Sequence, residues 1–140
     1  MIGSSLRIFI DRMIDKGNID DADVALLREE ICREGISNRS EADALIALDR
    51  LVHVPEAWGD FLVKALLSFT LRQTVSTGGM LSHDYVSWLI SSLDIGVPTE
   101  RAFRIAAAIV SETHCVDEYL RRFAKGFTSD LHALDVRTAA

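Results

Sequence analysis

The sequence predicts an all-α protein of about seven helices, and three observations support this fold class. The chain has 140 residues but only 8 glycines and 2 prolines, so it contains few helix breakers. Its apolar residues recur at helical spacing rather than in alternation with polar ones. Junctions made of a glycine, an aliphatic residue and a helix-capping type occur at Gly17 and Gly35, and again 62 and 61 residues later at Gly79 and Gly96. A fixed internal period is the signature of a duplicated unit, so we expect two pseudo-repeated three-helix units.

The first two helices are predicted from one apolar stripe and one set of caps. A helix over about residues 4–15 ends at Gly17. Its apolar side chains follow i, i+3, i+4, i+7 spacing: Leu6, Phe9, Ile10 and Met13. The second helix follows the N-cap Asp20, with Asp23 as the partner in a capping box, and ends at Gly35.

The third helix is predicted to follow the cap Ser37. Asp49 and Arg50 are expected to face water near its end. The apolar side chains expected to point inward are Ala42, Leu45, Ile46 and Leu48.

The fourth helix is predicted to be the longest, the most apolar and the central one. Pro55 suits its first position, and Gly78 and Gly79 end it. Its stripe consists of Trp58, Phe61, Leu62, Ala65, Leu66 and Phe69. We expect Phe61 and Leu66 to be deeply buried.

The remaining helices follow the same logic. Ser82 caps the fifth helix, and Pro98 or Thr99 opens the sixth. The stripe of the fifth helix consists of Tyr85, Val86, Leu89, Ile90 and Leu93. A last helix is expected over about residues 114–124, and the tail over residues 125–140 either continues it or frays.

The aliphatic residue after each junction glycine predicts how the helices are joined. Ile19 and Ile36 in the first repeat, and Leu81 and Val97 in the second, are expected to pair as minimal strands, in the manner of EF-hand pairs. Two units of this size would not each bury a good core. We therefore expect one domain over residues 1–140, with pseudo-repeats over about 4–53 and 55–112.

Charge and composition exclude several classes of protein. The net charge is −6, and residues 1–62 hold all of it, with 7 Lys and Arg against 13 Asp and Glu. Such a chain repels phosphate backbones, so no nucleic-acid binding is expected. No apolar run is long enough to predict a membrane span, and no signal peptide is evident at the start. A cytoplasmic protein is expected, with Cys32 and Cys115 as reduced core residues.

Metal binding and catalysis find little support in the residues. Placing Ile19 at position 8 of a calcium loop puts Arg12, Ile14 and Lys16 at ligand positions, so we expect no metal and no cofactor. Asp15, Asp20 and Asp23 are the candidates for a weak cation site, against the alternative of a solvated, dipole-favoured helix start.

Catalytic motifs are equally weak, and the protein is not expected to be an enzyme. Ser82, His83 and Asp84 are the residue types of a hydrolase triad, but consecutive residues cannot form its hydrogen-bonded chain.

Candidate interaction residues come from two places. Trp88 lies off the apolar stripe of its helix and is a candidate for a surface groove. The basic-aromatic patch of the chain consists of Arg121, Arg122 and Lys125, interleaved with Phe123 and Phe127.

A duplicated helical chain with glycine-aliphatic-cap junctions resembles the tellurite-resistance TerB-like superfamily over about residues 4–124. The resemblance implies a bacterial protein with acidic residues beside the junction glycines, and some such proteins are thought to bind metal there. The corresponding residues here are Asp15, Asp20, Glu34 and Asp94, and no Asp directly precedes a junction glycine.

Two functions are compatible with these features. The first is a non-catalytic helical interaction module that binds a protein partner or a second copy of itself. The alternative is a small-ligand or metal-binding stress-response protein of the TerB-like kind.

Overall fold

The fold is all-α, as predicted. The structure is a computed structural model that describes residues 2–114 and 117–126. Over these residues the structure contains seven α-helices and no strand, and 72% of the described residues are helical. The chain forms two compact units, Met1–Thr70 (unit 1) and Leu71–Ala140 (unit 2). The boundary therefore falls inside a helix rather than between the predicted repeats, and the single-domain organisation stays a prediction.

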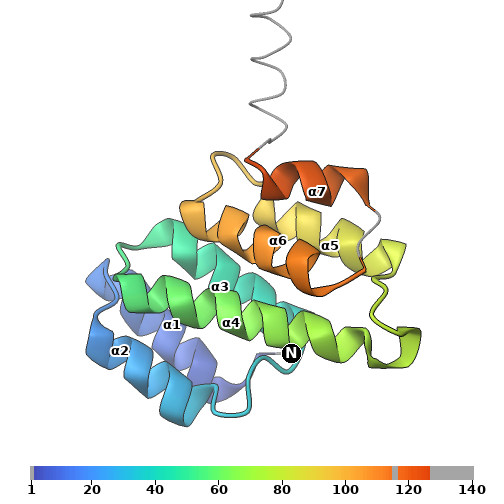
Figure 1. The fold of residues 1–140 in the computed structure, drawn as a ribbon. Coiled ribbons are helices and arrows are strands. Elements are labelled where there is room, and N and C mark those ends of the chain that lie inside the picture. The colour runs from blue at the N-terminus through green and yellow to red at the C-terminus, as the bar shows by residue number, and fades with distance from the viewer. Residues whose placement is uncertain (1, 115–116, 127–140) are drawn as a thin grey trace, which may run out of the picture. The chain divides into compact units, whose positions relative to one another are not determined.

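Unit 1 holds the first four helices, coloured from blue to green in Figure 1. They are α1 (Ser4–Lys16), α2 (Asp21–Leu26), α3 (Arg39–Leu51) and most of α4 (Glu56–Gln73). The π-helical turn η1 (Leu27–Ile31) continues α2 without a break. Within this unit, α1 packs against α3 and against η1.

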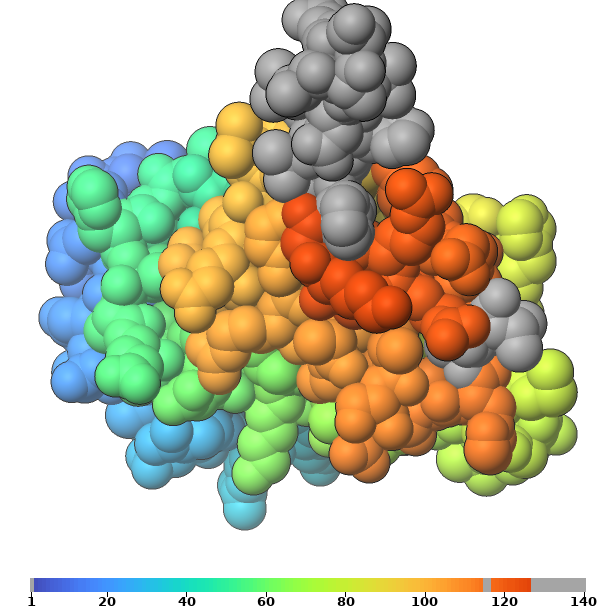
Figure 2. Space-filling model, turned by 45° about the horizontal axis from the view of Figure 1, so that its top comes forward, coloured from blue at the N-terminus to red at the C-terminus, as the bar shows by residue number. Residues whose placement is uncertain are grey.

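Unit 2 begins with the last turn of α4 and a 3-10 turn, η2 (Val75–Thr77). Three helices follow, α5 (His83–Leu93), α6 (Glu100–Glu112) and α7 (Glu118–Ala124). Figure 2 shows α6 and α7 lying side by side. Because Asp117 caps α7, this helix starts later than the predicted residue 114, and residues 115–116 lie outside the described residues.

Most helix starts follow the predicted capping chemistry. The Asp20 carboxylate accepts from the Asp23 N–H at 2.8 Å, and the Asp23 carboxylate accepts from the Asp20 N–H at 3.1 Å, which completes the capping box. Ser82 and Thr99 cap α5 and α6 as predicted.

The cap of α3 was predicted one residue too early. Asn38, not Ser37, is the N-cap, and its side-chain oxygen accepts from the Glu41 N–H at 2.9 Å. Asn caps a helix as well as Ser does, so residue type alone does not decide which of the two neighbours is the N-cap. Ser37 instead donates its backbone N–H to the Glu41 carboxylate at 2.9 Å.

The prediction that Asp49 faces water is wrong. Asp49 is 4% exposed, and its Oδ1 accepts from Nε1–H of the fully buried Trp58 at 2.9 Å. A buried indole N–H requires an acceptor, and this carboxylate on α3 supplies it.

Phe61 also departs from its predicted place, whereas Leu66 does not. Leu66 is fully buried, but Phe61 is only half-buried. The apolar residues of α4 cover more than one face, and the face carrying Leu62 and Leu66 is the one that turns toward the core. Phe61 lies on a neighbouring face.

The predicted pairing of junctions is wrong, and a different pairing replaces it. Asn18 forms a parallel bridge with His53, in which the Ile19 N–H donates to the His53 carbonyl at 2.8 Å. Met80 forms the matching bridge with His114 in unit 2. Each first junction thus pairs with the residue after the third helix of its repeat, not with the second junction.

The two bridges preserve the period of the sequence. Met80 follows Asn18 by 62 positions, and His114 follows His53 by 61 positions. The glycine before each bridge, Gly17 or Gly79, has a positive φ, of 78° and 95° respectively. Superposition of the two repeats stays a prediction that this shared bridge position favours.

We expect Leu66→Ala to leave a folded but clearly weakened protein. Truncating a fully buried leucine costs about 2–5 kcal/mol, out of a total of about 5–15 kcal/mol for a typical domain. Urea denaturation followed by circular dichroism measures this loss. Asp21→Ala, at an exposed position in the first turn of α2, is the control and should change little. Equal midpoints for Leu66→Ala and the parent would show that α4 is not central to the core.

Candidate functional site

A lysine of the same chain pairs with two carboxylates of the acidic junction after α1. Lys16 Nζ lies 2.6 Å from Asp23 Oδ2 and 3.7 Å from Asp20 Oδ2. Of the three predicted candidates, the structure thus brings Asp20 and Asp23 together, while Asp15 lies exposed on α1. The lysine ammonium takes the place that a bound cation would need.

The pairing shifts the ionisation of both groups toward their charged forms. Burial of Asp23 opposes its ionisation, but hydrogen bonds from Lys16 and from the backbone of Asp20 outweigh burial and lower the pKa of Asp23. The hydrogen bond to Asp23 raises the pKa of Lys16. Among the described residues, no group of three or more His, Cys, Asp or Glu is placed to hold a metal ion.

The predicted interaction residues lie on two helices of unit 2. Trp88 is half-buried on α5, where its ring packs at a tilt on Tyr85 with a centroid distance of 5.2 Å. Arg121 and Arg122 are exposed on α7. Their neighbour Phe123 is a core residue, 1% exposed, and Phe127 lies outside the described residues. The patch is therefore basic but lacks the aromatic surface that was expected from Phe123.

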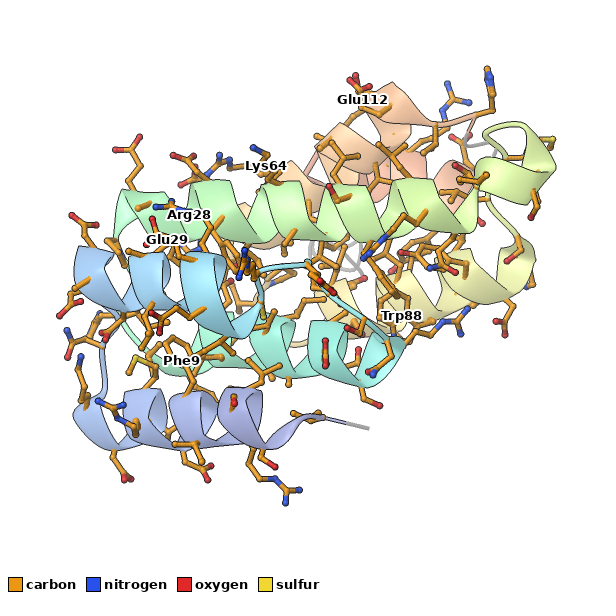
Figure 3. All side chains as sticks on the ribbon, turned by 90° about the horizontal axis from the view of Figure 1, so that it is seen from below. Phe9, Arg28, Glu29, Lys64, Trp88 and Glu112 are labelled. Carbon is orange, nitrogen blue, oxygen red and sulfur yellow. The ribbon has the colours of Figure 1, made fainter. Side chains whose placement is uncertain are left out.

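A groove of about 410 Å³ opens on unit 1, formed entirely by residues of that unit. One wall is a face of α4, and the other is η1 with the turn that follows it. The α4 wall consists of Ala57, Asp60, Phe61, Lys64, Ala65 and Ser68. The opposite wall consists of Arg28, Cys32, Arg33 and Gly35. Figure 3 labels Arg28 and Lys64 on these two neighbouring elements.

The π-helical turn positions the second wall. The Cys32 N–H donates to the Leu27 carbonyl at 2.7 Å, five residues back, which is the bond that defines a π turn. Arg28 and Cys32 both line the groove from this turn. Gly35 then reverses the chain with φ of 86°, and its N–H donates to the Cys32 carbonyl at 2.9 Å. A side chain at this φ is strained, so glycine is required here.

The apolar residues of the α4 wall, Ala57, Phe61 and Ala65, form the floor of the groove. The side chains of Ala57 and Ala65 are small and therefore leave open space in the groove. Phe61 lies between them along α4. Phe61 packs at a tilt on the buried Trp58, with a centroid distance of 5.9 Å. The half-exposed aromatic ring is thereby held against the core of unit 1.

The rim of the groove is cationic. Arg28, Arg33 and Lys64 are exposed along it, against the single lining carboxylate of Asp60. Arg28 Nη2 lies 3.9 Å from Glu29 Oε1, but both side chains are more than half exposed, so this ion pair is weak. Within the described part of the chain, Arg33 and Lys64 form no ion pair.

Cys32 contributes a neutral thiol to the groove. Burial, aided by the negative charge of Glu41, raises the pKa of the Cys32 thiol to about 11. The thiol is therefore protonated at neutral pH, whereas the thiolate is the nucleophilic form. Cys32 acts here as an apolar lining residue.

Sequence reasoning missed this groove, although one signal for it was present. The six apolar residues assigned to one stripe of α4 span a wider face than a core contact needs. Phe61 and Ala65 lie on the side of that stripe that is not needed for the core contact, and this side lines the groove.

Comparisons with protein-family models, with curated proteins and with solved structures found no match to this chain. None of the described helices combines the length and the apolar character needed to cross a membrane. The chemistry of the groove and of the acidic junction is thus the basis on which a function is proposed.

We expect Lys16→Gln to destabilise the protein modestly near pH 7 and to have less effect in acid. The folded-state pKa of Asp23 is lowered, so the stabilisation by the pair is present above the ordinary carboxyl pKa of 3.8 and is lost as the pH falls through the folded value. Urea denaturation at about pH 7 and about pH 3 measures the difference. Arg7→Gln, at an exposed position on α1, is the control. An equal loss at both pH values would contradict the pairing.

We expect about 1 mM calcium to leave the melting temperature of the parent protein unchanged within about 1 °C. A ligand stabilises a protein only in proportion to its affinity for the native state, and Lys16 already occupies the acidic junction. Differential scanning fluorimetry with and without a chelator checks this expectation. A rise of several degrees that is absent in Asp23→Asn would reveal a cation site at the junction.

Proposed function

We propose that this chain is a non-catalytic helical interaction module and that the groove of unit 1 binds a protein partner. The observation that carries the proposal is the combination of an apolar floor, an anchored aromatic ring and exposed arginines in one open groove. Aromatic and arginine side chains are enriched in protein interfaces and supply much of their binding energy.

The environment of Phe61 supports this role. A half-buried ring that packs on a buried indole has few rotamers open to it, so binding a partner against it loses little side-chain entropy. The neighbouring alanines provide room for an apolar side chain of the partner. Such a pocket beside a fixed ring resembles the central anchor point of many interfaces.

A distinct partner fits the groove better than a second copy of this chain. The groove is a concave surface with three lining cations against one lining carboxylate, so two copies of it would repel each other face to face. A contact between the groove and another face of an identical chain would be heterologous, and such contacts produce rings or filaments. Self-association is the alternative, and the oligomeric state tests it.

A small-ligand function is the second candidate, because the groove volume of about 410 Å³ falls within the range of ligand pockets. This is the small-ligand form of a stress-response protein of the TerB-like kind. The metal-binding form has less support, since Lys16 pairs with Asp20 and Asp23 and the described residues hold no group of three or more ligands placed for a metal ion.

We expect a photo-crosslinking amino acid at position 61 to form a discrete protein adduct in the native cells. The same group at Ile8, which is 58% exposed on α1 and outside the groove, is the control and should form none. Ala65→Arg, added to the position-61 variant, should abolish the adduct because it fills the groove. Circular dichroism verifies that each variant is folded.

The outcomes separate the candidates. An adduct of twice the chain mass in the purified protein would indicate self-association through the groove. Equal adducts at positions 61 and 8, or none at position 61, would contradict the proposed protein partner.

A further inference from the structure

The walls of the groove specify the shape of its occupant, given the proposed function on which this inference rests. The α4 wall runs from Ala57 to Ser68 at positions i, i+3, i+4, i+7, i+8 and i+11, which is one continuous face of the helix. At 1.5 Å per residue this face is about 16 Å long. A groove of this length accommodates about three turns of a helix laid along it.

The walls also specify the pattern of apolar residues on the occupant. Phe61 stands in the middle of the α4 face, with Ala57 and Ala65 one turn to either side of it. The hollows over the two alanines lie eight residues apart on α4, or about 12 Å. Apolar side chains at i, i+4 and i+7 of a partner helix span about 10.5 Å, close to this distance, and this is the usual pattern of a helix bound in a groove.

The charges of the rim specify the flanks of the occupant. Lys64 stands on the α4 wall, one turn after the single lining carboxylate of Asp60. Arg28 and Arg33 stand on the opposite wall, so each wall carries a cation and cations outnumber carboxylates. A helix lying between them would place side chains from both of its flanks beside these cations. Carboxylates on both flanks satisfy them, and lysines or arginines there are repelled.

The negative charge outside the groove restricts which acidic partners can bind in it. The chain has a net charge of −6, and the groove is a cationic site within its acidic first part. A long polyanion would meet the surrounding carboxylates, whereas a short acidic helix contacts the groove alone. The local charge therefore favours a short acidic segment over a nucleic acid or an extended anionic surface.

We propose that the groove binds an amphipathic helix of a partner protein, in which one apolar stripe is flanked on both sides by Asp and Glu. The apolar stripe packs on Phe61 and the two alanines, and the carboxylates face Lys64 and Arg33.

Three synthetic peptides of about 14 residues test this proposal by fluorescence anisotropy with the full-length protein. The first has leucines at i, i+4, i+7 and i+11 flanked by glutamates. The second keeps the leucines and replaces each glutamate by lysine, and the third keeps the glutamates and replaces each leucine by serine. We expect the first peptide to bind at least about tenfold more tightly than either of the others, and to weaken as salt rises from about 50 to 500 mM.

Charge-reversal variants test the assignment residue by residue. Lys64→Glu and Arg33→Glu should each weaken binding of the glutamate peptide by about three- to tenfold. The double variant should instead prefer the lysine peptide. Arg12→Glu, an equal charge change at an exposed position of α1 outside the groove, is the matched control and should leave the preference unchanged.

Each further outcome is decisive. If the glutamate and lysine peptides bind equally, or neither binds at about 1 mM, the acidic-helix assignment is wrong. If the protein binds anionic vesicles but not the glutamate peptide, the cationic rim recognises a lipid surface and the assignment is also wrong. Either result together with a protein adduct at position 61 would leave the proposed interaction function standing, whereas the loss of that adduct as well would contradict both.

Discussion

The buried hydrogen bond between Trp58 and Asp49 joins α4 to α3 and fixes the inward side of α4 at its first turn, and the surface of unit 1 depends on which side of α4 faces inward. Both side chains are buried, and neither polar atom has water to replace its partner. With Trp58 fixed inward, Leu62 and Leu66 follow it into the core at helical spacing. Phe61 is then left on the adjoining face, where it lines the groove. The buried pair and the apolar face that continues from it along α4 therefore leave Phe61 in the groove.

The parts of the fold that could be predicted are those set by local chemistry. The capping box of Asp20 and Asp23 follows from residue types three positions apart, and the turn at Gly17 follows from a residue that tolerates positive φ. Asp49 and Phe61 could not be placed this way, because their surroundings depend on which face of α4 meets α3. The partner of Asn18 was missed for the same reason, since His53 is 35 positions away and only packing brings the two together.

Charge clusters formed by residues close in the sequence could be predicted, whereas those brought together by packing could not. Sequence reasoning found the acidic cluster after α1, and it noted Lys16 only as a residue that spoils a calcium loop. In the structure that lysine is the cation of the site, seven positions before Asp23. The cationic rim was not found, because Arg28 and Lys64 are 36 positions apart and each is unremarkable alone. A site made from two helices has no signature in either helix by itself.

The π-helical turn that carries Arg28 makes the groove sensitive to chain length. A turn closed by a bond to the fifth residue back holds one more residue than an α-helical turn. Deleting one residue between Leu27 and Ile31 would let the segment relax to a regular α-helix, while the residues on its two sides keep their orientation relative to each other. If Arg28 is the residue lost, the groove loses one of its three cations and the register of the flanking chain is unchanged. A single-codon deletion in a descendant of this gene is thus a route by which the fold persists while the charge of the binding surface changes.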